Sequence, residues 1–410
     1  MNIVIATVIF GTILVIIFEN RNPVKTIAWC MVLTFMPVIG LLLYILFGMD
    51  NRHRRQIKDE DLSRLKGITE ITQSDDILSE MPVPQKPLAD MLRKMNKSFL
   101  LSGNDVEIIT DFQTMSDRLI ADIEGARHHI NMLFFKFEDD AAGRRIADAL
   151  IRKSEEGVLV RLIYDDAGNL MVPRRFYRKL RKHGIQVRGF IRIFLPILSR
   201  DYNSRNHRKV VVIDGRVGYM GGMNIAQRYA EGLKWGIWRD THMRITGPAV
   251  SELQTSFLTD WKFTKGDEPD LAPMYPYNPP CGNTLMQIVT GGPMDKWNVM
   301  MQAYMTAIAS ARHHAYLQSP YFIPPEPIMK VLQNAALSGV DVRVMIPYRG
   351  DKGVLPPWAS RSYIKEALNA GIKMYLYRKG YMHAKTLVID NSLVTIGSTN
   401  LDFRGFEQDF

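Results

Sequence analysis

An internal duplication constrains this chain more than any other feature of its sequence. The stretch NHRKVVVID, which begins at Asn206, is echoed by MHAKTLVID, which begins at Met382. Other stretches match in the same order: ARHH at 126–129 and 311–314, GVLVRLIY from 157 and GVDVRVMI from 339, and YRKLRKHGIQVRGF from 177 and YIKEALNAGIKMYLY from 363. Matches that keep one order indicate two copies of one structural unit rather than coincidence.

Both copies predict the same succession of elements: helix, strand, helix, strand, helix, strand and then the motif strand. Helical periodicity is clear in FQTMSDRLIADIEGA (112–126) and in WNVMMQAYMTAIASA (297–311). Helices that alternate with apolar strands favour an α/β sheet covered on both faces. We therefore expect two α/β halves, the first over residues 96–285 and the second over 286–410.

The first half carries an extra loop, IRIFLPILSRDYNSRN, ahead of its motif strand. The apolar triplet Phe194–Pro196 within it could touch lipid or line a substrate groove. A plain surface loop is the equal alternative.

Two apolar segments without any charge open the chain, Ile3–Phe18 and Thr26–Met49. The second is long enough to span a bilayer and the first is slightly short. Pro37 is tolerated in a membrane helix when neighbouring groups satisfy the freed carbonyl. Residues 1–50 therefore predict a transmembrane helical hairpin. A cleaved signal peptide is the alternative, but it should begin with positive charge, and here the first charged side chain is Glu19.

Residues 51–95 are predicted to be a basic juxtamembrane segment and linker. More basic side chains follow the second apolar segment, at Arg52, Arg54, Arg55 and Lys58, than stand in the turn between the segments. The positive-inside rule then places the rest of the chain in the cytoplasm. The basic run either contacts anionic headgroups or is a solvated face. Likewise, the net charge of +10 fits an anionic partner or a merely basic surface.

Neither cysteines nor the paired histidines predict a metal site. The chain has two cysteines, Cys30 and Cys281, too few for a disulfide framework or a cysteine-based zinc site. Adjacent histidines in the two ARHH stretches point to different faces and lack an acidic partner at a suitable spacing. These stretches are therefore predicted to connect a helix to a strand, and no metal or other cofactor is expected.

The repeated strand carries the chemistry. Residues i and i+2 of a strand share a face, so His207 points the same way as Lys209, and His383 the same way as Lys385. The remaining positions are apolar, which predicts a buried strand. A buried cation needs a compensating partner, and a phosphate would supply charge-assisted hydrogen bonds. Solvated polar strand ends are the alternative.

Two further positions recur after each motif strand. Asp214 and Asp390 stand in dipeptides typical of hairpin turns, on the face opposite the histidines, so we expect them to shape the turn. The next strands end in GGMN and GSTN, whose small residues let the backbone approach a ligand. Asn224 and Asn400 can each donate to an oxyanion.

The duplicated H-x-K-x4-D pattern, each copy with G-x-x-N seven residues after its Asp, resembles the phospholipase D superfamily. The stretches NRNPVKTIAWCMVLTFMPVIGLLLYILFG, WRDTHMRITGPAV, SPYFIPP and WASRSYIKEALNAGIKMYLY resemble the bacterial cardiolipin synthases within it. The resemblance covers the chain from about residue 96 to the end, and the N-terminal hairpin. It implies duplicated α/β/α halves, packed on a pseudo-two-fold axis around one active site, in an enzyme of the bacterial inner membrane.

The resemblance also implies a reaction without cofactor. A phosphatidyl group passes from one phosphatidylglycerol to another through a phosphohistidine, and glycerol is released. The family usually assigns the nucleophile to the first motif, here His207, and the acid–base role to His383. The residues alone leave this open, because the halves are nearly symmetric. The side chains expected to stabilise the phosphoryl oxygens are Lys209, Lys385, Asn224 and Asn400.

A catalytic histidine normally needs an orienting carboxylate. The resemblance assigns Asp240, in WRDTH, to His207, with a plain surface charge as the alternative. For His383 the carboxylate should follow FRGFEQDF, in a closing part of the second half that we expect beyond the last residue of this sequence. Glu407 and Asp409 are the candidates within it.

Two other functions compete with transfer between lipids. One is hydrolysis of phospholipid or nucleic acid by the same superfamily machinery, and the other is an inactive, truncated membrane-anchored module. The stretch RRFYRKLRKHGIQVRGF interleaves basic and aromatic residues, as nucleic-acid surfaces do, but it also fits an amphipathic helix. The apolar hairpin favours phosphatidylglycerol and anionic membrane lipid, so no nucleic acid is expected. The sequence gives no indication of oligomeric state.

Overall fold

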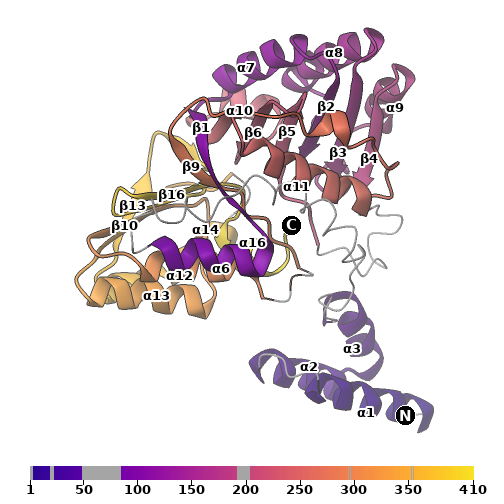
Figure 1. Ribbon diagram of the computed structural model, residues 1–410. Coiled ribbons are helices and arrows are strands. Elements are labelled where there is room, and N and C mark those ends of the chain that lie inside the picture. Colours follow the sequence, from indigo (N-terminus) through magenta and orange to yellow (C-terminus); the bar gives the residue numbers. More distant parts are fainter. Residues whose placement is uncertain are drawn as a thin grey trace.

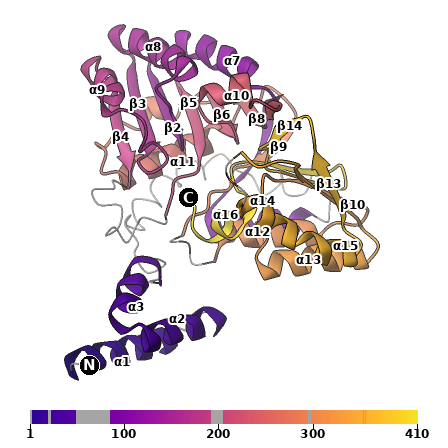
Figure 2. The ribbon, with the colours of Figure 1, turned by 180° about the vertical axis from the view of Figure 1, so that it is seen from behind.

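The structure is a computed structural model. It describes residues 3–18, 23–48, 85–191, 204–293, 295, 297–351, 353 and 355–410. The basic run at 52–58 and the triplet Phe194–Pro196, on which predictions were made, lie outside the described residues. Two α/β bodies lie side by side, and the N-terminal helices stand outside both of them in the two opposite views (Figures 1 and 2).

The N-terminal segment forms a small helical unit. Its elements are α1 (Ile3–Phe18), α2 (Pro23–Phe35), α3 (Pro37–Leu43) and the π-helical turn η1 (Tyr44–Gly48). Ile9, Ile16, Leu33 and Tyr44 bury themselves against one another where these helices meet. The helices of this segment therefore pack against one another, and the transmembrane hairpin stays a prediction.

The prediction of one continuous helix over residues 26–49 is wrong. It is interrupted at Met36, where φ is −130° and ψ is 67°, and a new helix starts at Pro37. Proline has no N–H to donate and clashes with the preceding turn, which explains the break. Within the described part of the chain, no helix is both long enough and apolar enough to cross a membrane.

The first half is built on one mixed sheet. Its elements are β1 (Leu100–Ile109), α7 (Phe112–Glu124), β2 (His129–Phe134), α8 (Ala141–Glu155), β3 (Leu159–Asp165), α9 (Arg174–Lys182), β4 (Gln186–Phe190), β5 (Lys209–Ile213), β6 (Val217–Gly221), α10 (Gln227–Glu231), β7 (Ile237–Arg239), β8 (His242–Thr246) and α11 (Val250–Phe263). The strand order is β4-β3-β2-β5-β6-β8-β1-β9, and the last strand, β9 (Thr284–Gln287), follows the short 3-10 helix η4 (Ala272–Met274). Asp111 and Asp140 are the N-cap residues of α7 and α8. Their carboxylates accept from the backbone N–H groups of Thr114 and Gly143, respectively.

Apolar residues fill both faces of this sheet. One cluster packs the sheet against α7, α8 and α9, and a second packs it against α11. Figure 1 shows α7, α8 and α9 on one side and α11 on the other. The prediction of a sheet covered on both faces is confirmed for this half.

The second half repeats the arrangement. Its elements are α12 (Val299–Ala309), β10 (His314–Gln318), β11 (Phe322–Ile323), α13 (Glu326–Leu337), β12 (Asp341–Pro347), α14 (Leu355–Ser362), α15 (Ile364–Asn369), β13 (Lys373–Tyr377), β14 (Gly380–Met382), β15 (Thr386–Ile389), β16 (Leu393–Ile396), β17 (Leu401–Asp402) and α16 (Phe403–Glu407). Its sheet has the strand order β13-β12-β10-β15-β16. Taken one by one, these strands correspond to β4-β3-β2-β5-β6 of the first half. The predicted succession of helices and strands is therefore confirmed in both copies.

One helix lies where a linker was predicted. Helix α6 (Lys86–Asn96) places Leu88 and Leu92 in the hydrophobic core of the second half. At the edge of the first sheet, β1 pairs with β9. The predicted boundaries of the halves, at 96–285 and 286–410, stay predictions. Helix α6 precedes the first half in the chain but packs in the second, and strand β9 spans the boundary between residues 285 and 286.

The halves are joined next to both motif strands. Tyr381, two residues before His383, pairs with Trp238 where β14 runs parallel to β7. Reciprocally, Arg205, two residues before His207, forms a parallel bridge with Asp409. This is the pairing that a pseudo-two-fold relation between the halves requires.

Candidate active site

The motif histidines stand at the heads of two central strands. His207 precedes β5 and His383 precedes β15, and both strands lie in the middle of their sheets. Lys209 and Lys385 are 2% and 1% exposed. Each ammonium donates to the backbone carbonyl of the histidine two residues before it. The predicted burial is confirmed for β5, whose residues are all buried, whereas β15 is fully buried only at Leu387 and Ile389.

The motif aspartates, Asp214 and Asp390, stabilise turns and make no contact with the motif histidines His207 and His383. The carboxylate of Asp214 accepts from the backbone N–H groups of residues 127, 128 and 129, at 2.8 to 2.9 Å. Asp390 does the same with residues 312, 313 and 314, at 2.6 to 2.8 Å. Burial opposes ionisation, but these N–H groups hold the pKa of Asp214 below its ordinary value. The repeated ARHH stretches are thus the partners of the repeated aspartates, and they connect a helix to a strand as predicted.

Asp240 pairs with His383 and not with His207, the histidine to which the resemblance assigned it. Its Oδ2 lies 2.7 Å from Nδ1 of His383, and the carboxylate is buried. The expected pairing with His207 is wrong because the β7–β14 ladder carries Asp240 across to the second half. The backbone N–H of His383 donates to the carbonyl of Arg239 at 2.7 Å, directly before Asp240.

The two carboxylates proposed for His383 are engaged elsewhere. Glu407 pairs with Lys25 at 2.7 Å. Asp409 pairs with Arg404 at 3.1 Å, and burial raises its pKa to about 7. The expectation that either one orients His383 is therefore corrected in favour of Asp240.

His207 has a backbone partner in place of a carboxylate. Its Nδ1 lies 2.9 Å from the carbonyl oxygen of Ser398, in the GSTN stretch of the other half. A carbonyl can only accept, so Nδ1 carries the proton and Nε2 keeps its lone pair. His207 is partly exposed, and the ring of Phe135 packs edge-on at 4.8 Å.

The same reasoning fixes the tautomer of His383. Asp240 as a carboxylate can only accept, so Nδ1 of His383 donates to it. Lys385 Nζ also lies 2.8 Å from this nitrogen. That contact is between two donors, because Nδ1 carries the proton directed at Asp240 and an ammonium can only donate. Burial lowers the pKa of Lys385 to about 8, although Asp240 opposes it.

The site disfavours positive charge on its histidines. Burial, and then Lys209, Lys385 and His383, place the pKa of His207 well below its ordinary value. Burial and Lys385 lower the pKa of His383 to about 4, although Asp240 opposes them. The charges that lower the pKa of His207 thus include two side chains of the other motif, Lys385 and His383. A phosphate between the two motifs would relieve the repulsion and raise all of these pKa values.

The two asparagines lie in unlike surroundings. Asn224 accepts at Oδ1 from the backbone N–H of Lys136 (3.2 Å) and donates from Nδ2 to the hydroxyl of Tyr229 (2.8 Å). Asn400 is 8% exposed, and its buried Oδ1 has no hydrogen-bond partner within the described residues. Their predicted role toward phosphoryl oxygens stays a prediction.

Aromatic residues around His383 were not singled out from the sequence. The rings of Trp238, Tyr229 and Tyr381 have centroids 5.6, 6.0 and 5.9 Å from its imidazole. Trp238 and Tyr381 each stand two residues before a site residue, in WRD and in YMH. That spacing could have indicated that both side chains lie close to the site. Tyr229, in a short helix, had no comparable signal.

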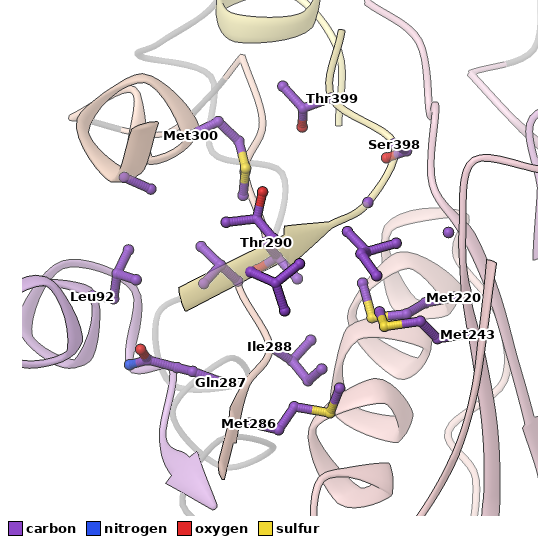
Figure 3. A pocket seen from close by; sticks show the side chains of 18 of the residues that line it. Leu92, Met220, Met243, Met286, Gln287, Ile288, Thr290, Met300, Ser398 and Thr399 are labelled. Carbon is purple, nitrogen blue, oxygen red and sulfur yellow. The ribbon is translucent and has the colours of Figure 1, made fainter. Parts of the chain in front are cut away.

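A cavity of about 630 Å³ lies behind the first motif strand. Its wall is mostly apolar, with Met220 and Met243 from the first half on one side and Leu92 and Met300 on the other (Figure 3). Ser398, the partner of His207, also lines it. The site thus borders apolar space that both halves enclose, which the motifs did not indicate.

A family model described as "Cardiolipin synthase, PLD-like domain" matches residues 119–261 and 304–410. A second, described as "Phospholipase_D-nuclease N-terminal", matches residues 7–48. The first model covers both motif strands and most of both halves.

Curated relatives agree with the family model. The cardiolipin synthase of Geobacillus kaustophilus is 38% identical over 97% of this chain and 80% of its own length. The major cardiolipin synthase ClsA of Bacillus subtilis is 37% identical over 97% of this chain and 85% of its own. The solved phosphatidylserine synthase of Haemophilus influenzae shares the fold, with a TM-score of 0.58 at 14% identity over 79% of this chain and 85% of that one. With two H-x-K-x4-D strands meeting at one site, the chain belongs to the cardiolipin synthases, phosphatidyltransferases of the phospholipase D superfamily.

Proposed function

We propose that this enzyme joins two molecules of phosphatidylglycerol through a phosphohistidine on His207, with His383 as the general acid and base. One observation carries the assignment of roles. Nδ1 of His207 donates to a neutral carbonyl, whereas Nδ1 of His383 donates to the carboxylate of Asp240. A carbonyl fixes the tautomer and leaves Nε2 nucleophilic, while a carboxylate also stabilises the imidazolium that an acid–base catalyst must form.

In the first step, Nε2 of His207 attacks the phosphorus of one phosphatidylglycerol. The bond from phosphorus to the headgroup oxygen breaks, and Nε2–H of protonated His383 gives that oxygen its proton. Glycerol leaves, and the phosphatidyl group stays on His207. Asp240 holds the positive charge of His383 until the proton is transferred.

In the second step, a hydroxyl of another phosphatidylglycerol attacks the same phosphorus. His383 takes the proton of that hydroxyl, and the bond from phosphorus to His207 breaks. Cardiolipin is formed and both histidines return to their starting states. We expect Lys209 and Lys385 to stabilise the extra negative charge on the phosphoryl oxygens in both steps. Their low exposure makes that interaction stronger than it would be in water.

Incubation with phosphatidylglycerol labelled in its headgroup and in its phosphate tests the reaction. We expect labelled cardiolipin and one free glycerol for each cardiolipin formed, because the acceptor keeps its own headgroup. Protein carrying His207→Ala and His383→Asn together is the control and should give neither. Phosphatidic acid without cardiolipin would instead assign water as the acceptor and a hydrolase function. No product from the unaltered chain would favour the inactive module.

We further propose that the apolar N-terminal helices attach the enzyme to the bacterial inner membrane, with the catalytic body in the cytoplasm. The ion pair of Lys25 with Glu407 keeps the start of α2 on the same side as that body. Helix α1 carries no charged side chain, and Phe10 and Phe18 are 64% and 82% exposed. Water would not stabilise such a surface, but lipid would.

Single cysteines placed after residue 60 test the orientation. In intact spheroplasts an impermeant maleimide should leave them unlabelled, and it should label them after lysis. Both native cysteines are first replaced by serine. Labelling before lysis would contradict the cytoplasmic placement.

A further inference from the structure

Tyr229 breaks the equivalence of the two halves. It stands five residues after Asn224, in helix α10, and the residue five after Asn400 is Gly405. A Cβ at Gly405 would lie 2.5 Å from the backbone oxygen of Asn400, so the backbone there leaves no room for a side chain. The first half therefore sends an aromatic side chain toward the site from a position where the second half has none.

The ring of Tyr229 is fixed by packing. It is 4% exposed, and its centroid lies 4.7 Å from that of Trp238 and 6.2 Å from that of Phe112. Trp238 is itself paired, through β7 and β14, with the strand that leads into His383. The position of the Tyr229 hydroxyl is thus set by both halves.

The hydroxyl joins two parts of the catalytic apparatus. Its oxygen accepts from Nδ2 of Asn224 at 2.8 Å and lies 3.4 Å from Nδ1 of His383. Because Nδ1 of His383 carries the proton that it shares with Asp240, the hydroxyl oxygen faces two donors, Nδ2 of Asn224 and Nδ1–H of His383. Burial, and then Asp240, raise the pKa of Tyr229 far above its ordinary value, so the group stays a neutral hydroxyl.

We propose that Tyr229 is a positioning residue, which locks Asn224 and the His383–Asp240 pair into one hydrogen-bonded unit and so confines acid–base work to His383. His207 has no equivalent, since Gly405 occupies the matching position. The inference rests on the proposed roles of the two histidines, and it adds the residue that makes nearly symmetric halves act differently.

Tyr229→Phe removes the hydroxyl and keeps the ring packing. We expect kcat to fall about tenfold, the effect of one uncharged hydrogen bond on a barrier, with KM nearly unchanged. We also expect the pKa of His383 to fall, because the imidazolium loses an oxygen acceptor beside Nδ1. Histidine-labelled NMR titration reads this second effect directly, with the His383 signal assigned from the His383→Asn spectrum.

Tyr177→Phe is the matched control. Its hydroxyl is also buried and donates to one acceptor, the backbone oxygen of Phe137, at 2.9 Å. Both variants should lose similar thermal stability, but only Tyr229→Phe should change kcat and the titration of His383. If the two variants agree in both, Tyr229 has a merely structural role and the inference is wrong.

A third variant separates this inference from the proposed function. In an Asp240→Asn background, Tyr229→Phe should have little further effect on kcat, because both act through His383. Fully multiplicative losses would contradict the proposed unit. If the unaltered protein makes no cardiolipin, the proposed function fails, while the His383 titration still decides whether Tyr229 acts on that imidazole.

Discussion

Replacing His207 with alanine is expected to prevent any covalent phosphatidyl-enzyme and to slow turnover at least ~100-fold. The side chain supplies the only nitrogen proposed to bond to phosphorus. Its Nδ1 donates to the Ser398 carbonyl, which leaves the lone pair of Nε2 available for attack. Turnover with labelled phosphatidylglycerol measures the loss.

His383→Asn should cause a loss of similar size by a different route. The phosphatidyl group can still reach His207, slowly, but its removal lacks a base. Because the two histidines act as one unit, the double variant should be little worse than either single variant. Full turnover by both single variants would contradict the phospholipase D mechanism, and multiplicative losses would contradict their acting as a unit.

Asp240→Asn is expected to reduce kcat on the order of 10²–10⁴-fold, as loss of the orienting carboxylate does in catalytic triads. An amide can present a donor to Nδ1 of His383 and cannot stabilise its positive charge. Since Asp240 raises the pKa of His383, its removal lowers that pKa further. The protonated acid is then lost at lower pH, so the alkaline limb of the kcat/KM profile should move toward lower pH. An unmoved limb would mean that Asp240 does not act on His383.

Gly222→Ala disturbs the same carboxylate without removing it. A Cβ at Gly222 would lie 2.1 Å from Oδ1 of Asp240, so the carboxylate must shift away from His383. The variant should therefore lose activity in the same direction as Asp240→Asn. Gly125→Ala is the control, because its added Cβ would have no neighbour closer than 3.5 Å. Equal activity of the two alanine variants would show that the carboxylate position matters little.

The sequence predicted what is local and repeated. The succession of elements, the burial of the first motif strand and the turn-forming role of Asp214 all follow from spacing within one half. The partner of Asp240 does not, because it depends on the register between β7 and β14, strands from different halves. Asp240 and His383 are 143 residues apart in the chain. A local pattern cannot show which histidine such a residue will meet.

Other features depended on tertiary context in the same way. Helix α6 has the periodicity of an amphipathic helix, but only its packing shows that it belongs to the second half rather than to a linker. Pro37 was noted as tolerable within one long helix, yet the chain breaks there into α2 and α3. The site role of Tyr229 depends on a hydroxyl that reaches across the interface between the halves.

Locating the phosphatidyl group on the protein tests the central assignment most directly. The His383→Asn protein is incubated with radiolabelled phosphatidylglycerol, quenched in alkaline detergent to preserve phosphohistidine, and mapped by peptide mass spectrometry. The account predicts label on the peptide that contains His207, and none on the His207→Ala protein. Label on His383 of the His207→Ala protein, with none on the His383→Asn protein, would contradict it.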